Sequence, residues 1–300
     1  MKSIQVMLSA YNGCLYLSQQ IESILVQENV EVSLLIRDDG STDQTMKLLQ
    51  TYEKRYPNIS VYAGSNRGAA GSFYDLLQNA GRSFDYYAFA DQDDIWFPDK
   101  LSAAVAMLET ESDRMPLLYA GKVICASKDL KKREAFSYRT DRKPDFGNAL
   151  LENICMGCTQ VFNRPLLILV REHLMQRTVM HDWWMYLTAA YFGKVIYDQH
   201  AYMLYRQHDK NVVGMKNQWG KRWRNRIRHF SQMKHKLSDQ AELFRMAYAP
   251  IVKDDVRLRL LCEYRRHVML KLKLIFSKSI YRQNRLDDIV CRLLFIISYL

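Results

Sequence analysis

Two groups of carboxylates interrupt an otherwise apolar pattern early in the chain. Asp38 and Asp39 end one apolar run, and Asp91, Asp93 and Asp94 end another. Crowded carboxylates repel one another unless they share a cation. Two or three of their oxygens suit a hard cation such as Mg²⁺ or Mn²⁺, above all where substrate phosphates complete the coordination. The spacing therefore indicates a divalent cation beside a phosphate-bearing ligand.

The same residues also have an ordinary interpretation. Asp and Gly are favoured in any turn, which would explain the run from Asp38 to Gly40. The acidic residues before Pro98 could cap the helix that begins there. Either group alone is therefore weak evidence for a metal, and the two together are stronger only if they meet in space.

The elements around these carboxylates alternate between strands and helices. Apolar runs predict strands at 3–9, 30–37, 59–63 and 86–90. Helical spacing predicts helices at 15–27, after 43 to about 55, and at 70–80 and 98–109. This rhythm predicts an α/β fold with a mostly parallel sheet between helices. Ligands of such sheets bind at the carboxyl ends of the strands, where both acidic groups fall.

The rest of the chain is less regular. Further strands are predicted at 117–125, 157–163, 194–197 and 201–206. Further helices are predicted at 165–173 and 182–192, and the polar segment 127–144 is expected to be a loop or flap.

Six motifs, taken in order, resemble those of the inverting, nucleotide-sugar-dependent glycosyltransferases of family two, which have the GT-A fold. They are Ser9-Ala10-Tyr11-Asn12, Asp38-Asp39-Gly40-Ser41-Thr42-Asp43, Asn66-Arg67-Gly68, Ala90-Asp91-Gln92-Asp93-Asp94-Ile95-Trp96, His181-Asp182-Trp183-Trp184 and Tyr205-Arg206-Gln207-His208. The resemblance covers residues 1–214. The last three motifs look like those of bacterial rhamnosyltransferase-type members, which typically use dTDP-L-rhamnose to build capsule, O-antigen or cell-wall polysaccharide. The resemblance alone implies rhamnose, and a UDP-hexose donor is the alternative.

This resemblance implies a role for each matching residue. The residues implied to line the nucleotide base and ribose pocket are Ala10, Asn12, Asp38 and Asp39. Asp91 and Asp93 correspond to the D-x-D pair that holds Mn²⁺ or Mg²⁺ against the donor diphosphate, with Asp93 as the direct ligand. His208 is similar to a histidine that completes the metal shell in some relatives, and a purely structural histidine is the alternative.

Asp182 is the residue implied to act as general base. In an inverting transfer the acceptor hydroxyl attacks the anomeric carbon from the face opposite the departing nucleotide. A carboxylate within hydrogen-bond reach must take its proton. Asp182 begins an apolar helical segment, so capping that helix is the alternative, although a cap could also serve in catalysis.

Two positions depart from the family pattern. His181 stands where many relatives carry a second acid, so its role is open. The first loop lacks the proline that is common after the first strand. Neither departure removes a reacting group.

Composition and charge divide the chain near residue 214. It has 300 residues, 48% of them apolar and 25% charged, as expected for a folded protein. No run approaches the ~18 apolar residues of a membrane span, and no signal-peptide core is present at the start, so a cytoplasmic location is expected. The net charge of +11 arises in residues 215–300, which carry +13 against −2 for residues 1–214. The six cysteines are scattered, and Cys155 and Cys158 are expected to be buried thiols.

Residues 215–300 are therefore predicted to form a separate basic helical region. An apolar stripe at helical spacing runs from Trp219 to Phe244, with Lys and Arg between its members. Such a helix suits the anionic inner face of the plasma membrane, where the resemblance places glycan or lipid-linked glycan acceptors. The alternative is that the stripe packs on the catalytic domain and that its charges are simply solvated. No nucleic-acid motif is present. A non-catalytic membrane-bound scaffold is the second functional hypothesis, and the oligomeric state is open.

Overall fold

The computed structural model describes residues 1–136, 140, 142–174, 180–208 and 234–300. It contains two compact units. The first comprises Met1–Ser137, Cys155–Gln176 and Met180–His208, and the second comprises Tyr138–Ile154, Arg177–Val179 and Asp209–Leu300.

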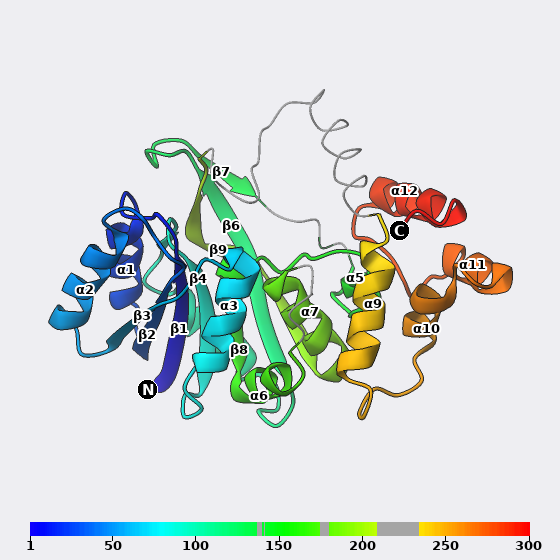
Figure 1. The fold of residues 1–300 in the computed structure, drawn as a ribbon, viewed down its shortest axis with the longest axis horizontal. Coiled ribbons are helices and arrows are strands. Elements are labelled where there is room, and N and C mark those ends of the chain that lie inside the picture. The colour runs from blue at the N-terminus through cyan, green and yellow to red at the C-terminus, as the bar shows by residue number, and fades with distance from the viewer. Residues whose placement is uncertain (137–139, 141, 175–179, 209–233) are drawn as a thin grey trace. The chain divides into compact units, whose positions relative to one another are not determined.

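The first unit alternates strands and helices along the chain (Figure 1). Its strands are β1 (Lys2–Ala10), β2 (Val30–Asp38), β3 (Ile59–Ala63), β4 (Tyr86–Asp91), β5 (Ile95–Trp96), β6 (Leu117–Ala126), β7 (Arg133–Phe136), β8 (Val161–Asn163) and β9 (Lys194–Arg206). Its helices are α1 (Leu17–Leu25), α2 (Thr45–Arg55), α3 (Gly68–Asn79), α4 (Lys100–Leu108), the 3₁₀ turn η1 (Gly157–Thr159), α6 (Arg164–Glu172) and α7 (His181–Phe192).

One sheet joins all of these strands in the order β3-β2-β1-β4-β8-β6-β9-β5, with β7 paired to β6. β1 to β4 are parallel, and β6 runs parallel to β9, whereas β8, β5 and β7 pair antiparallel with their neighbours. The predicted α/β class is confirmed, and the sheet becomes mixed beyond β4.

The central strands are buried on both faces, which explains their near-continuous apolar sequence. On one face Ile4, Val6 and Leu8 of β1 share a core with apolar residues of α1, α2 and α4. The alternate residue Met7 is also buried, and α3 packs on β1 and against α6 and α7. Because both faces are covered, the sheet opens to ligands only at its edges and strand ends.

Three local predictions were wrong. β9 is one strand of 13 residues rather than two short ones, because its pairing with β6 continues across bulges. The segment expected to be only a loop contains β7, which pairs with β6. The strand expected from Gly157 begins at Val161 instead, after the η1 turn.

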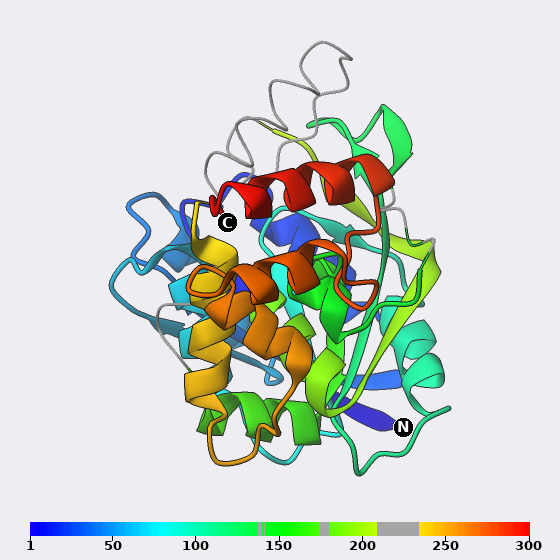
Figure 2. The same ribbon diagram turned by 90° about the vertical axis from the view of Figure 1, so that its right-hand side faces the viewer.

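The second unit is helical in its described residues, with α5 (Phe146–Ala149), α9 (Lys236–Ala247), α10 (Val256–Glu263), α11 (Val268–Ile275) and α12 (Arg285–Ile296) (Figures 1 and 2). Segment 142–154 belongs to it because Asn148 donates to the Tyr281 carbonyl (3.1 Å) and Glu152 pairs with Arg282 (3.1 Å). Among the described helices none has both the length and the apolar character to cross a bilayer.

The predicted amphipathic stripe falls partly outside the described residues, from Trp219 to Met233. Its described members, Leu237, Ala241 and Phe244, lie on α9 and are buried inside the second unit. This described part of the stripe is therefore buried within the chain, and the rest of the stripe lies outside the described residues.

Candidate active site

The carboxyl ends of β1, β2 and β4 meet at one edge of the sheet. In the strand register Ala10 of β1 lies opposite Asp38 of β2, and Ser9 lies opposite Asp91 of β4. The structure therefore brings together the two acidic groups that the sequence places 53 positions apart, from Asp38 to Asp91.

Hydrogen bonds between two loops fix the predicted nucleotide-pocket residues. Asn12 has a left-handed backbone (φ 47°), and its Oδ1 accepts the Thr42 N–H at 2.8 Å. Its own N–H donates to Ser41 Oγ at 2.9 Å, and the Asp38 carboxylate accepts the Ser41 N–H at 3.0 Å. The loop after β1 is thus tied to the loop after β2.

Asp39 is held in a buried ion pair that the sequence analysis missed. Arg37 is only 1% exposed and pairs with Asp39 and, at 3.3 Å, with Asp75. Its guanidinium also donates to the Ser65 carbonyl (2.9 Å). Asp39 accepts the Arg67 N–H as well, at 2.9 Å. A lone Arg inside an apolar strand was the available signal, since a buried guanidinium requires partners.

Gln92 is a second residue that the sequence analysis missed. Its amide accepts the Tyr11 N–H at 2.8 Å and donates to the Tyr11 carbonyl at 3.0 Å. A β-carbon on Gly13 would collide with this side chain. The middle residue of the D-x-D motif thus fastens the end of β4 to the loop after β1.

The end of β4 concentrates negative charge. Burial, followed by the charges of Asp93 and Asp182, raises the pKa of Asp91 to about 7. Burial and the charges of Asp93 and Asp91 also raise the pKa of Asp94 well above its usual range. The charge of Asp182 contributes to the raised pKa of Asp91, so the predicted base lies within electrostatic range of the D-x-D motif.

His208 joins this cluster from the end of β9. Its Nε2 lies 2.6 Å from Asp93 Oδ2. The ring stacks on Tyr16, with centroids 5.3 Å apart, and the Arg206 guanidinium lies 4.6 Å from the same Tyr16 ring. Arg206 Nε donates to the Asp93 carbonyl at 2.8 Å. Tyr16 and Arg206 therefore support both His208 and Asp93.

Two sets of side chains could hold a divalent cation here. One is Asp93 with His208, whose side chains contact each other; among the described residues Asp91 does not join these two in a three-ligand group. The other is Asp91, Asp94 and Cys158, whose ligand atoms lie within 4.8 Å of one another. Burial raises the pKa of the Cys158 thiol well above its usual range, so it stays protonated and suits a hard cation poorly. Asp94 Oδ2 is buried and has no hydrogen-bond partner in the described chain. Carboxylates this crowded fit a cation.

Asp182 lies in the first turn of α7, two residues after the N-cap, Met180. Its Oδ2 accepts the Gly157 N–H at 3.1 Å, and its Oδ1 accepts the Trp183 N–H at 2.8 Å. The Asp182 carbonyl accepts from Gln160 at 2.9 Å. Asp182 is thus not the N-cap of this helix, and two backbone donors orient its carboxylate.

His181 lies inside the core beside this carboxylate. Its ring stacks on Phe73 with centroids 4.0 Å apart and meets Phe89 edge-on at 5.0 Å. Burial lowers its pKa to about 3, so the imidazole is neutral near pH 7. Neither ring nitrogen has a hydrogen-bond partner among the described residues. His181 therefore supplies packing rather than charge.

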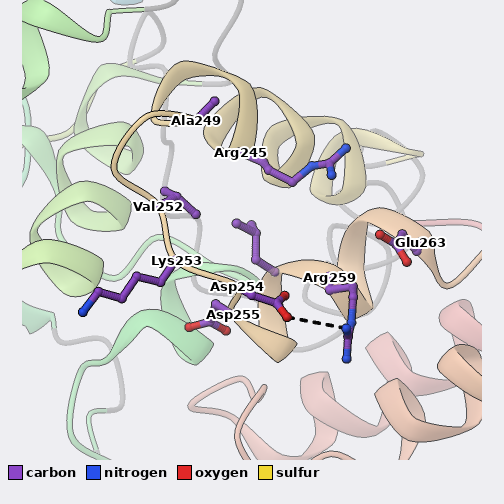
Figure 3. Close-up of a pocket in the computed structure, with 9 residues that line it drawn as sticks. Arg245, Ala249, Val252, Lys253, Asp254, Asp255, Arg259 and Glu263 are labelled. Carbon is purple, nitrogen blue, oxygen red and sulfur yellow. Dashed lines mark ion pairs between the residues drawn. The ribbon is translucent and has the colours of Figure 1, made fainter.

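A separate pocket of about 250 Å³ lies in the second unit, between α9 and α10 (Figure 3). Its lining mixes both signs of charge, and Asp254 and Arg259 form a 3.7 Å ion pair across it. It contains none of the residues predicted to act in the site.

Similarity to known proteins agrees with this geometry. Residues 5–169 match the family model described as Glycosyl transferase family 2. The chain is 31% identical over 218 residues to the dTDP-rhamnosyl transferase RfbG of Shigella flexneri, which covers 69% of this chain and 73% of RfbG.

Two solved structures share the fold. TarS 1–349 of S. aureus, in complex with UDP-GlcNAc, has a TM-score of 0.57 at 16% identity, covering 99% of this chain and 91% of that one. The mannosyltransferase PcManGT of Pyrobaculum calidifontis, in complex with GDP-Man and Mn²⁺, has a TM-score of 0.56 at 14% identity, covering 98% and 85%. The fold is therefore GT-A, and with the match over residues 5–169 the chain belongs to glycosyl transferase family 2.

Proposed function

We propose that this enzyme is a metal-dependent inverting glycosyltransferase that uses Asp182 as general base and transfers L-rhamnose from dTDP-L-rhamnose to a glycan or lipid-linked glycan. The observation that carries the proposal is the position of Asp182, oriented by two backbone N–H groups and close enough to Asp91 to raise its pKa. The rhamnose donor is supported by the 31% identity to a dTDP-rhamnosyl transferase.

In this proposal Asp182 and the Asp91–Asp93 pair carry out different parts of the reaction. Asp182 accepts the proton of the acceptor hydroxyl as that oxygen attacks the anomeric carbon. The N–H groups of Gly157 and Trp183 each donate to one oxygen of the Asp182 carboxylate, and these two hydrogen bonds fix its orientation for this step.

Asp91, Asp93 and His208 would hold Mn²⁺ or Mg²⁺. When bound, this cation neutralises charge that develops on the departing nucleotide diphosphate. Asp93 is positioned for this by Arg206, which fixes its carbonyl, and by His208, which contacts its carboxylate. The PcManGT structure, in complex with GDP-Man and Mn²⁺, supports this assignment.

Ala10, Asn12, Asp38 and Asp39 would form the nucleotide pocket. The loops that carry them are joined by the Asn12 and Ser41 hydrogen bonds, which hold the two walls of this pocket together. The carboxylates of Asp38 and Asp39 already accept hydrogen bonds within the chain, so we expect them to shape these walls.

The runner-up donor is a UDP-hexose. It is supported by the TarS structure, whose ligand is UDP-GlcNAc. We further propose that residues 1–214 catalyse transfer while residues 215–300 bring the enzyme to the cytoplasmic face of the plasma membrane. The +13 charge of the second segment supports attraction to anionic lipids.

A donor screen tests the proposal. The purified full chain is titrated with dTDP-rhamnose, UDP-glucose, UDP-galactose and UDP-GlcNAc in Mn²⁺ or Mg²⁺, and slow donor hydrolysis is followed with and without EDTA. We expect metal-dependent turnover of dTDP-rhamnose that falls 10²–10⁴-fold in Asp182→Asn. Preference for a UDP-sugar would replace the donor and keep the mechanism.

Matched variants separate chemistry from folding. Asp93→Ala should abolish the effect of metal on donor binding, and the exposed Asp113→Asn should change nothing. Full turnover in a folded Asp182→Asn protein would refute the role of the base. Absence of binding to every donor would favour a non-catalytic scaffold.

A further inference from the structure

Helices α11 and α12 of the second unit form an antiparallel hairpin. Lys271, in the first turn of α11, donates to the carbonyl of Ile296 at the end of α12 (3.2 Å). Arg292, earlier on α12, donates to the carbonyl of Ile275 at the end of α11. The start of α11 thus contacts the end of α12, and the end of α11 contacts an earlier residue of α12. The two helices therefore run in opposite directions (Figure 2).

Both helices expose apolar side chains. On α11 and just after it, these are Val268, Met269, Leu272 and Phe276; on α12 and just after it, they are Leu286, Ile289, Leu293, Ile296 and Ile297. Each of these side chains is between 44% and 77% exposed. Isolated exposed apolar residues are common on soluble proteins, but nine on two packed helices form a patch.

The exposed apolar side chains of α11 (the α11 stripe) and those of α12 (the α12 stripe) lie on the same side of the hairpin. At about 100° per residue, the α11 stripe fills an arc of roughly 100° that begins beside Lys271 and Ile275, which face α12. The α12 stripe fills a similar arc that begins beside Arg292, which faces α11. In an antiparallel pair of right-handed helices, arcs that advance in the same sense from the contact line lie on one face.

Basic residues border this apolar face. Lys273, Lys278 and Arg285 are exposed at its margins, and α11 contains no acidic residue. Asp288 of α12 is on the other side of the contact line and pairs with Arg292 at 2.9 Å. The first turn of α12 also carries Asp287, so the border is net positive, with Lys273, Lys278 and Arg285 against one carboxylate.

We infer that the exposed face of the α11–α12 hairpin docks on a lipid bilayer that contains anionic headgroups. An apolar helical face with Lys and Arg at its edge inserts at the boundary between headgroups and acyl chains, and the basic residues bind the headgroups. This membrane surface lies at residues 268–297, and it differs from the described part of the predicted stripe, Leu237, Ala241 and Phe244, which is buried. The inference rests on the proposed attachment of residues 215–300 to the membrane and names the surface that makes the contact, whichever sugar is transferred.

Vesicle sedimentation of the full chain tests the inference. The probes are vesicles of phosphatidylcholine alone and vesicles that also contain about 30% phosphatidylglycerol, an anionic lipid that gives the surface a negative potential. We expect binding to the anionic vesicles. Phe276→Asp and Leu293→Asp should each weaken it by on the order of tenfold, because each removes the burial of one large apolar side chain.

Two control substitutions identify the surface. Ile251→Asp places the same charge at an apolar residue that is 44% exposed in the turn after α9, and should leave vesicle binding unchanged. Lys273→Ser with Arg285→Ser should weaken binding to anionic vesicles only. Donor hydrolysis without vesicles should be unaffected in all of these variants, so loss of docking and failure of the proposed function are separable.

Three results would overturn the inference. The first is absence of binding to both vesicles. The second is equal binding by the wild type, Phe276→Asp and Leu293→Asp, which would assign attraction to basic residues elsewhere. The third is a wild-type oligomer, measured by light scattering, that dissociates in Leu293→Asp without any vesicle binding, which would make a second copy of the chain the occupant.

Discussion

Replacing Gly157 with Ala should disturb the proposed base without touching it chemically. Gly157 donates its N–H to Asp182 Oδ2 at 3.1 Å. A β-carbon there would lie 3.0 Å from His181 Nε2 and 3.3 Å from Asp182 Cβ. The His181 ring has little room to retreat, because it stacks on Phe73 with centroids 4.0 Å apart. The added methyl group should therefore displace Asp182 as well.

The size of the effect follows from these distances. Ordinary contact begins near 3.4 Å, so His181 or its neighbours must move by about 0.4 Å. The 3.3 Å contact requires Asp182 itself to move by about 0.1 Å, and by up to about 0.4 Å if it follows its neighbour His181. If a 1 Å misplacement of a reacting group costs about a hundredfold in rate, these shifts cost about 1.6- to 6-fold. Overpacking should lower the free energy of unfolding by about 1–3 kcal/mol, partly offset by about 0.4–1 kcal/mol from the less flexible unfolded chain.

The assay compares kcat for donor hydrolysis with the midpoint of urea unfolding. Gly121→Ala is the matched control, because its β-carbon would lie 3.1 Å from Tyr119 Oη, within a strand and away from Asp182. We expect both variants to lose similar stability and only Gly157→Ala to lose kcat. Unchanged kcat in Gly157→Ala, or an equal loss in Gly121→Ala, would show that the position of Asp182 does not limit the reaction.

Three further predictions concern the charges of the site and its supports. Between the ordinary pKa of 3.8 and its folded value of about 7, Asp91 binds more protons in the folded than in the unfolded protein. In the presence of EDTA, the free energy of unfolding measured with urea should therefore fall as pH rises from about 4 to about 7. Asp91→Asn should lack this contribution to the pH dependence, and an unchanged dependence in that variant would contradict the assignment. Arg37→Met should lower the free energy of unfolding by about 3–5 kcal/mol, because it leaves Asp39 buried without its ion pair. Arg67→Met is the control: its side chain is 55% exposed, and the free energy of unfolding should change by less than about 1 kcal/mol. Equal losses in the two variants would contradict the importance of the buried pair. Tyr16→Phe should keep the affinity for Mn²⁺, whereas Tyr16→Ala should weaken it about 10–100-fold, because only Tyr16→Ala removes the ring that stacks on His208. The affinity is measured by titration followed by electron paramagnetic resonance. Equal affinities would show that the Tyr16 ring does not support His208.

Local sequence patterns were enough to predict the fold class of the first unit. Apolar runs of strand length alternate with helical spacing as far as residue 109, and each of these predicted elements is present within a few residues. Parallel strands bring their carboxyl ends to one edge, so Asp38 and Asp91 could be expected to meet there. Beyond β4 the sequence pattern predicts the strands less well, because the antiparallel strands β8 and β7 are short and depend on pairing with other strands.

Contacts between distant segments were decided only by the tertiary structure. The approach of His208 to Asp93 joins residues 115 positions apart, and the Gly157 hydrogen bond to Asp182 depends on the η1 turn, which the pattern predicted as a strand. The sequence by itself determined which acidic residues lie at the strand ends, because strand period and parallel pairing are local rules. Packing decided which of them are supported, paired or buried, and it also decided that the apolar stripe of α9 lies inside while those of α11 and α12 face outward. Helical periodicity identifies an apolar face but not what covers it.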